Sequence, residues 1–226
     1  MSRAVVTVSG GLDSVTLAHL LFADGWDLTL ASFDYGQRHV KELDYAEACA
    51  ARLGVGHRVV DLRSVGALLS GSALTDDGVD VPEGHYTDES MKATVVPNRN
   101  MILLSVATGL AVAEGADVVA TAVHAGDHPI YPDCRPEFIS GFEALARRAN
   151  EGFAPAEFSV LAPFLHMDKA SIVAKAAELD VPLRDTWSCY RGGERHCGRC
   201  GTCVERREAF EVAGVTDPTE YETVAV

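Results

Sequence analysis

The chain has 226 residues, of which 47% are hydrophobic and 23% charged, and these values are typical of a folded globular protein rather than a disordered or fibrous one. Its 33 acidic residues against 19 Lys and Arg give a formal net charge of −14, which disfavours non-specific binding to nucleic acids and anionic membranes. No stretch approaches the roughly 18 apolar residues of a membrane span, and the N-terminus lacks the apolar segment of a signal peptide, so we expect a cytoplasmic protein with no membrane or nucleic-acid partner.

The predicted elements alternate between strand and helix along most of the chain. Residues 4–8 are apolar, mostly β-branched and too few for a helix, which is typical of a strand buried on both faces of a parallel sheet. The same reasoning predicts, in chain order, strand 4–8, helix 15–23, strand 28–33, helix 40–53, strand 57–62, helix 101–114, strand 118–123, helix 136–150, strand 158–161 and helix 168–179. This order predicts a doubly wound, Rossmann-like α/β fold.

Two segments depart from the alternation. Residues 70–89 are polar and rich in Gly, Asp and Ser, which predicts a long loop. The tail after the last predicted helix contains a group of cysteines and one more helix near 205–212. Because the length leaves little room for a second complete core, we expect one α/β domain, 1–185, with a C-terminal extension, 186–226, packed on it.

A glycine-rich turn joins the first predicted strand to the first helix. Its sequence is Ser9-Gly10-Gly11-Leu12-Asp13-Ser14. Such a turn directs backbone N–H groups and the positive helix end at one point, which favours phosphate. Asp13 would repel phosphate unless a cation lies between them, so we expect it to face Mg²⁺ or to cap the helix. Neither the P-loop pattern nor the G-x-G-x-x-G dinucleotide pattern is present, and the alternative is an ordinary strand-to-helix turn.

The chain has six cysteines, and four of them lie close together in the tail. Cys49 and Cys134 stand apart, whereas the other four are Cys189, Cys197, Cys200 and Cys203. Four thiolates in a glycine-rich loop suit a closed tetrahedral zinc site, whose binding energy would help to fold the tail. An iron–sulfur cluster and disulfide or redox chemistry are the alternatives, although the spacing differs from the ferredoxin pattern.

Several single residues have both a structural and a functional interpretation. Arg99 opens a long apolar helix and is a candidate for binding an anion, whereas Asn98 or Asn100 would cap that helix. Asp133 and Arg135 follow the fourth strand, at the carboxyl edge of the sheet where such folds bind ligands. For most of the others the structural interpretation is preferred. Cys134 and Trp187 are expected to be packing residues, Lys169 and Arg184 solvated charges, and Asp168 a helix N-cap. Tyr35 and His39 remain undecided.

The glycine turn resembles the PP-loop of the ATP pyrophosphatase superfamily, which has an adenine nucleotide alpha hydrolase-like fold. Further motifs narrow the resemblance to the 7-cyano-7-deazaguanine synthase family, over a match from about Val5 to Tyr221. These motifs are Phe33-Asp34-Tyr35-Gly36-Gln37-Arg38-His39, Val96-Pro97-Asn98-Arg99-Asn100, Tyr131-Pro132-Asp133-Cys134-Arg135, Thr186-Trp187-Ser188-Cys189-Tyr190 and Cys197-Gly198-Arg199-Cys200-Gly201-Thr202-Cys203.

The resemblance implies an ATP-dependent ligase of queuosine-type 7-deazapurine biosynthesis. It implies that 7-carboxy-7-deazaguanine, ATP and ammonia give 7-cyano-7-deazaguanine through an acyl adenylate and an amide, with Mg²⁺, a structural Zn²⁺ and a homodimeric state. Asp13, Arg38, Arg99 and Arg135 are then the candidate catalytic residues. The candidate ATP-binding residues are Val8, Ser9, Gly10, Gly11, Leu12, Asp13, Ser14, Val15, Thr16, Leu17 and Ala18, and the candidate metal ligands are Cys189, Cys197, Cys200 and Cys203.

Two rival functions remain open at this point. A PP-loop tRNA sulfurtransferase would need a reactive cysteine and usually has a basic RNA-binding face, which the charge of −14 does not favour. A non-catalytic zinc- and nucleotide-binding module would bind ATP without turning it over.

Overall fold

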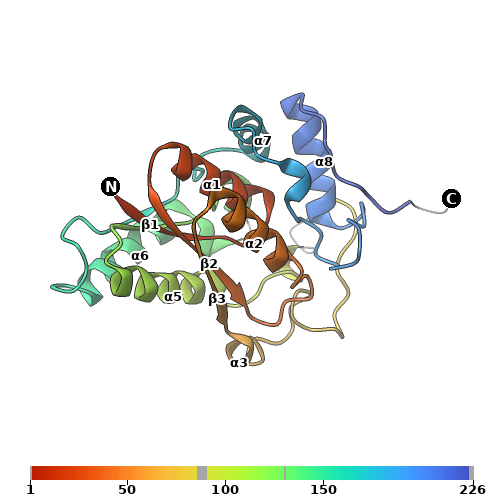
Figure 1. Cartoon of the computed structure of the whole chain (residues 1–226). Helices are drawn as coiled ribbons and strands as arrows, with labels where there is room; N and C mark the ends of the chain where they lie inside the picture. Colours follow the sequence, from red (N-terminus) through yellow and green to blue (C-terminus); the bar gives the residue numbers. More distant parts are fainter. Residues whose placement is uncertain (1, 86–90, 130, 224–226) are drawn as a thin grey trace.

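The computed structural model describes residues 2–85, 91–129 and 131–223. Its five strands form a parallel sheet in the order β3-β2-β1-β4-β5 (Figure 1). The predicted doubly wound α/β fold is therefore confirmed. The strands are β1 (Arg3–Thr7), β2 (Asp27–Asp34), β3 (Gly56–Asp61), β4 (Val118–Ala120) and β5 (Ser159–Leu161).

The helices cover both faces of the sheet. They are α1 (Leu12–Ala23), α2 (Glu42–Leu53), α3 (Arg63–Gly66), α5 (Arg99–Glu114), α6 (Pro136–Ala149), α7 (Lys169–Glu178) and α8 (Gly201–Ala213). Short 3₁₀ turns are η1 (Ala125–Asp127), η2 (Pro132–Cys134) and η3 (Leu183–Asp185). Within the described ranges, no helix combines the length and the apolar character needed to cross a membrane.

Strand β1 shows why the first apolar run has no polar side. Ala4 and Val6 pack into the cluster that contains α1, α2, α7 and α8, whereas Val5 packs into the other cluster with α5 and α6. All three side chains are fully buried. Because successive side chains of a strand point to opposite faces, a central strand covered by helices on both sides must be apolar throughout.

Some boundaries differ from the prediction. Helix α1 begins at Leu12, three residues early, because Gly11 is its N-cap. Strand β4 ends at Ala120, since its pairing with β1 stops there and the chain turns toward η1. Helix α3 was not predicted; it packs closely on β2, and a Cβ on Gly66 would overlap the backbone of Tyr35. The described part of the predicted loop 70–89 contains no regular helix or strand, and its residues 86–89 lie outside the described ranges.

The strand order places a crevice at the carboxyl ends of β1 and β4. The connections after β1 lead through α1 toward β2 and β3, whereas β4 and β5 lie on the other side of β1. The loops that follow two such strands diverge, and ligands of doubly wound folds bind at this switch point. The segments at the crevice are residues 8–11 after β1 and residues 121–127 after β4.

The segment after residue 185 packs against the same helical face as α1. Phe210 of α8 lies in the core cluster with α1 and α7. Arg206 is fully buried, and its guanidinium donates hydrogen bonds to Thr186 Oγ1 at 2.9 Å and Leu183 O at 2.9 Å. An ion pair with Asp217 at 3.4 Å neutralises its charge. Because a buried charge needs partners of this kind, Arg206 anchors the segment.

Candidate functional site

The glycine loop has the geometry that an anion site requires. Gly10 has φ +92°, and a Cβ at this position would overlap the carbonyl oxygen of Glu42 in α2. Ser14 Oγ donates to Gly11 O at 3.1 Å, and Gly11 N–H donates to Ser9 Oγ at 3.2 Å, so the two hydroxyls hold the loop in shape. No side chain caps α1 within the described chain. Its first N–H groups are therefore available to an anion.

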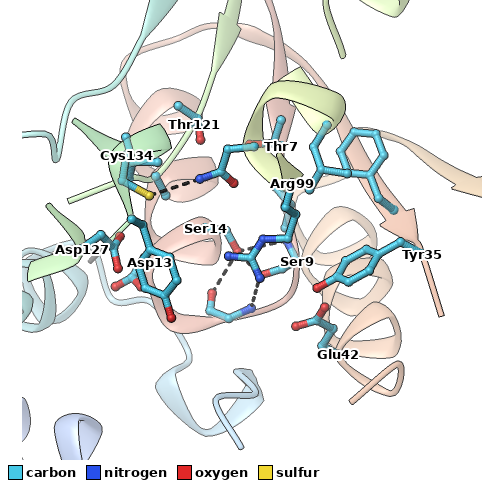
Figure 2. A pocket seen from close by; sticks show the side chains of 18 of the residues that line it. Thr7, Ser9, Asp13, Ser14, Tyr35, Glu42, Arg99, Thr121, Asp127 and Cys134 are labelled. Atoms are coloured by element: carbon cyan, nitrogen blue, oxygen red, sulfur yellow. Dashed lines mark hydrogen bonds between the residues drawn. The ribbon is translucent and has the colours of Figure 1, made fainter. Parts of the chain in front are cut away.

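A cavity of about 250 Å³ lies beside this loop (Figure 2). One part of its wall is the loop and the segment after β4, which place hydroxyls and backbone around an anion. The rest combines aromatic and apolar side chains with the charged groups of Glu42 and Arg99, a lining that suits a planar ligand with polar groups. The lining residues used below are Ser9, Gly11, Asp13, Ser14, Tyr35, His39, Glu42, Arg99, Asp127, Tyr131, Cys134 and Tyr190.

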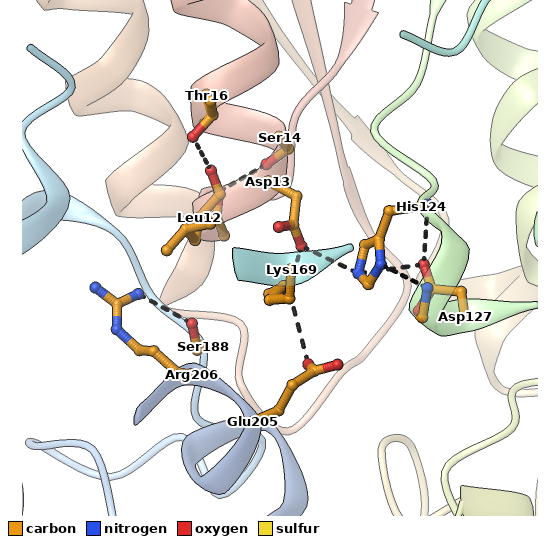
Figure 3. A network of polar contacts seen from close by, with 12 residues as sticks. Leu12, Asp13, Ser14, Thr16, His124, Asp127, Lys169, Ser188, Glu205 and Arg206 are labelled. Atoms are coloured by element: carbon orange, nitrogen blue, oxygen red, sulfur yellow. Dashed lines mark hydrogen bonds and ion pairs between the residues drawn. The ribbon is translucent and has the colours of Figure 1, made fainter. Parts of the chain in front are cut away.

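Asp13 belongs to a buried network of charges below the loop (Figure 3). Its Oδ2 lies 2.5 Å from Lys169 Nζ and 3.8 Å from His124 Nε2, while Lys169 also lies 3.7 Å from Glu205 Oε2. Burial alone would raise the pKa of the Asp13 carboxyl, but Lys169 and His124 bring that pKa below its ordinary value. Asp13 is therefore ionised, and it does not cap α1. The prediction that Lys169 is a solvated charge was wrong, because its side chain is only 18% exposed and is paired.

The second oxygen of Asp13 is open to a cation. Asp13 Oδ1 is buried and has no hydrogen-bond partner among the residues the structure describes. A carboxylate oxygen beside an anion-binding loop is a ligand that Mg²⁺ accepts. The site therefore fits the predicted magnesium ion, held through Asp13.

Arg99 is the cation of the cavity. It is the first residue of α5, and Figure 2 shows its guanidinium pointing into the cavity near Ser9 and Tyr35. Burial opposes its charge, but the oxygens of Tyr35, Tyr190 and Tyr131 raise the pKa of Arg99 above its ordinary value. Arg99 forms no ion pair with a carboxylate of the described chain, although its charge lowers the pKa of the nearby Glu42 carboxyl. A guanidinium without an acidic partner is suited to an anionic ligand.

The other two candidate arginines are placed differently. Arg38 Nη2 donates to the carbonyl oxygens of Asp76 at 3.0 Å and Val79 at 3.1 Å, which fastens the polar loop. Arg135 Nε donates to His128 O at 2.7 Å at the start of α6. Neither side chain lines the cavity. Of the three arginines, the structure brings only Arg99 to the glycine loop.

Asp133 and Cys134, which follow the fourth strand, support α5. The Asn100 N–H donates to Asp133 Oδ2 at 3.1 Å, and Asn100 Nδ2 donates to Cys134 Sγ at 3.1 Å. Asp133 therefore caps the helix that carries Arg99, while the Asn98 side chain makes no cap bond. Burial, with Asp127 and Asp133 nearby, raises the pKa of the Cys134 thiol. Cys134 thus stays protonated and is a poor nucleophile.

The four clustered cysteines form a closed group that could hold a metal ion. Their sulfur atoms all lie within 4.8 Å of one another and the residues are buried. A tetrahedron with Zn–S bonds of about 2.3 Å has sulfur atoms about 3.8 Å apart, close to the 4.0 Å between the sulfurs of Cys197 and Cys203. The N–H groups of Arg199 and Cys200 donate to Cys197 Sγ at 3.4 and 3.2 Å, which stabilises a thiolate. The cluster is compatible with zinc.

Two residues of the site were not identified from the sequence. Glu42 opens α2 and lines the cavity, but it was expected only as part of a helix. Lys169 is the first residue of α7, directly after the predicted N-cap Asp168, whose side chain accepts the Ser171 N–H at 2.8 Å. A lysine at a positive helix end is unfavourable. That placement was the available signal that Lys169 has acidic partners.

Gly10 provides a test of the loop geometry. Gly10→Ala should lower the melting temperature and weaken ATP binding about tenfold or more, because the new Cβ collides with α2 while the residue is strained at positive φ. Gly25→Ala is the matched control: Gly25 has φ +82° but no atom within 4 Å of an added Cβ. Calorimetry and nucleotide titration of both variants measure the difference. Equal losses in the two variants would contradict a special role for the loop.

Comparison with known proteins gives consistent matches over nearly the whole chain. A family model described as queuosine biosynthesis protein QueC matches residues 3–214. A Rhizobium meliloti protein named 7-cyano-7-deazaguanine synthase is 61% identical over 97% of this chain and 92% of its own length. A Brucella ovis protein of the same name is 60% identical over 97% of this chain and 94% of its own length.

Solved structures with similar folds are more distant. A predicted subunit of a tRNA methyltransferase from Methanocaldococcus jannaschii has a TM-score of 0.51 at 17% identity, covering 79% of this chain and 75% of that chain. The U34-tRNA thiolase NcsA from Methanococcus maripaludis has a TM-score of 0.50 at 15% identity, covering 99% and 75%. At such identities the likeness concerns the fold alone.

Proposed function

The chain belongs to the family of queuosine biosynthesis protein QueC, and on that basis we propose that it makes 7-cyano-7-deazaguanine from 7-carboxy-7-deazaguanine, ammonia and ATP. The observation that carries this proposal is the 61% identity over 97% of the chain to a relative named 7-cyano-7-deazaguanine synthase. The cavity supports it independently, because a phosphate-binding loop, a cation and aromatic walls face one another there. These are the groups that a purine-like carboxylate and ATP require.

In the proposed reaction, ATP converts a poor leaving group into a good one twice, first at the carboxylate oxygen and then at the amide oxygen. A carboxylate oxygen of the substrate attacks the α-phosphorus of ATP, pyrophosphate leaves, and ammonia then displaces AMP to give the amide. The amide oxygen attacks a second ATP in the same way, and loss of AMP leaves the nitrile. No covalent bond to the protein is needed, which agrees with the protonated state of Cys134. The protein contributes positioning and stabilisation of charge.

Each part of the site has a role in this proposal. Residues 8–18 hold the ATP, with the free N–H groups at the start of α1 around its phosphates. Arg99 orients the substrate carboxylate or the α-phosphate, and Asp13 would hold the magnesium ion. When bound, Mg²⁺ neutralises charge on the phosphate oxygens as pyrophosphate leaves. Lys169 keeps Asp13 ionised and in place.

The four-cysteine cluster is proposed to hold a structural zinc ion through Cys189, Cys197, Cys200 and Cys203. Four protein ligands complete a tetrahedron and leave no position for a reacting water. We also propose that the protein is a cytoplasmic homodimer, which sedimentation of the purified protein would test.

Product analysis is the decisive experiment. Mass spectrometry of the products from 7-carboxy-7-deazaguanine, ATP and ammonium should reveal the nitrile together with AMP and pyrophosphate. ADP with orthophosphate, or binding of ATP without turnover, would contradict the proposal. Arrest at the amide would indicate a one-step ligase. A thiouridine formed on tRNA with a sulfur donor would support the sulfurtransferase alternative, which four buried, mutually adjacent cysteines do not favour.

A further inference from the structure

Glu42 lies where two hollows of the protein meet. It lines the main cavity and also a second hollow of about 150 Å³ that shares Ser9, Gly11 and Asp13 with it. Its side chain is only 10% exposed, and Figure 2 shows its carboxyl group in the cavity beside Tyr35. The carboxyl group is thus next to the loop at which the phosphates are proposed to react.

One oxygen of Glu42 is held and the other is open. Gln37 Nε2 donates to Glu42 Oε1 at 3.1 Å, and Gln37 is itself fixed by bonds to Phe33 O and Tyr35 N–H. Over the described ranges no hydrogen bond reaches Glu42 Oε2, which lies 3.5 Å from His39 Nε2. Burial lowers the pKa of His39 to about 3, so His39 is neutral. Oε2 is therefore a free acceptor in the cavity.

The other carboxylates of the cavity each lie beside a Lys or His side chain. Asp13 is paired with Lys169 at 2.5 Å. Asp127 Oδ2 accepts the His124 N–H at 3.4 Å and lies 3.6 Å from His124 Nε2. Glu42 differs from both, because the partner on its held oxygen is a neutral amide.

The surroundings of Glu42 disfavour the ionised form of its carboxyl group, but this form still occurs within the ordinary pH range. Burial raises the pKa of the Glu42 carboxyl to about 8, against the opposing effects of Gln37 and Arg99. A base is most useful when its pKa lies near the working pH. The titratable and charged groups that surround it in the two hollows are Asp13, Tyr35, His39, Arg99, His124, Asp127, Tyr131, Cys134, Lys169, Tyr190 and Glu205.

We propose that Glu42 is the catalytic base that removes the last proton from the substrate nitrogen as the nitrile forms. This inference rests on the proposed function and assigns a residue to its final step. The adenylated amide first loses one proton of its acidic iminium nitrogen to water and keeps one N–H. Glu42 Oε2 takes the remaining proton from the nitrogen, and the electron pair of that N–H bond becomes the third C–N bond. The C–O bond breaks, and its electrons leave with AMP. Glu42 then returns the proton to water.

The test supplies the amide and ATP directly, so that the ammonia-dependent step is bypassed. For the wild-type enzyme, nitrile formation should rise with pH and level off above about pH 8. Glu42→Gln should lower kcat about 100-fold or more and abolish this pH dependence, with the KM for ATP nearly unchanged. Glu42→Asp, which keeps a carboxyl group, should retain part of the activity. Glu47→Gln, an exposed position of the same helix, is the matched control and should behave as wild type.

The stability of Glu42→Gln separates a catalytic role from a structural one. Because the folded-state pKa is raised, Glu42 costs no stability below its ordinary pKa of 4.5. Stability then falls as the pH rises from 4.5 to about 8, above which the loss is complete. Glu42→Gln should therefore melt about 2 °C or more above wild type at pH 9. At pH 5 the variant and the wild type should have nearly the same melting temperature.

Two results would overturn the assignment while leaving the proposed function intact. One is a Glu42→Gln enzyme that forms nitrile with the wild-type pH profile. The other is a variant that melts below wild type at both pH values and loses ATP affinity in parallel with activity, which would make Glu42 structural. If wild-type protein forms no nitrile from the amide and ATP, the proposed function itself fails.

Discussion

Replacing Asp13 by asparagine should lower the rate of pyrophosphate release about 10³-fold or more. The open Oδ1 is the atom that faces the proposed cation, and Oδ2 is held by Lys169 at 2.5 Å. An amide keeps the shape but lacks the charge, so the metal is lost and charge on the phosphates is no longer neutralised as pyrophosphate leaves. A coupled assay for pyrophosphate, run with substrate and Mg²⁺, measures the effect.

The control for Asp13 must account for the buried lysine. Removing one partner of a buried ion pair is destabilising by about 3–5 kcal/mol, so Asp13→Asn should be compared with Asp13→Asn/Lys169→Met, which also removes the unpaired charge. The double variant should regain stability but not activity. Asp24→Asn, exposed at the end of the same helix, should change neither. Pyrophosphate release within tenfold of wild type in folded Asp13→Asn would show that the loop was wrongly assigned.

Replacing Cys200 by alanine should remove the metal and the folded structure of the tail together. A structural zinc site contributes about 10–16 kcal/mol in small zinc domains, which is comparable to the roughly 5–15 kcal/mol stability of a typical protein. The four cysteines sit in a third, smaller core cluster with Trp187, so little apolar surface replaces the metal. Elemental analysis gives the zinc content, and calorimetry gives the melting temperature.

Cys49→Ala is the control for the metal site. Cys49 is buried in α2 and lies outside the four-cysteine group. Its removal leaves a small cavity, which costs stability but should leave zinc content at one ion per chain. A Cys200→Ala protein that has lost zinc but keeps the wild-type melting temperature would argue against a structural role.

The sequence predicted the elements whose cause is local. Apolar runs located β1 and α5, because burial acts on neighbouring residues of the same run. The glycine loop and the four cysteines were also found, since their chemistry is contained in short stretches. Strand β4 shows the limit of such reasoning. Strand β4 ended early because its length depends on pairing with β1 and β5, which lie far away in the chain.

Side-chain roles set by distant partners could not be predicted in the same way. Arg38 lies next to His39, which lines the cavity. Its guanidinium, however, donates hydrogen bonds to the carbonyl oxygens of Asp76 and Val79, about forty positions later in the chain. Lys169 meets Asp13 across 156 positions. Residue type and spacing carry no information about such contacts, because they exist only once the sheet order brings α1 and α7 together.

The hydrogen bond from the Trp187 N–H to Gly10 O, at 2.9 Å, links the two chemical centres of the molecule. Trp187 lies two residues before the first metal-binding cysteine, and its indole N–H donates to Cys189 O at 2.8 Å. An ion bound by the four cysteines would therefore help to hold, through Cys189 and Trp187, the turn that is proposed to receive the triphosphate. Removal of that ion, by chelation or by oxidation of the thiols, would loosen the glycine loop while the sheet stays intact. Weakened ATP binding would therefore be the first effect of metal shortage or oxidative stress.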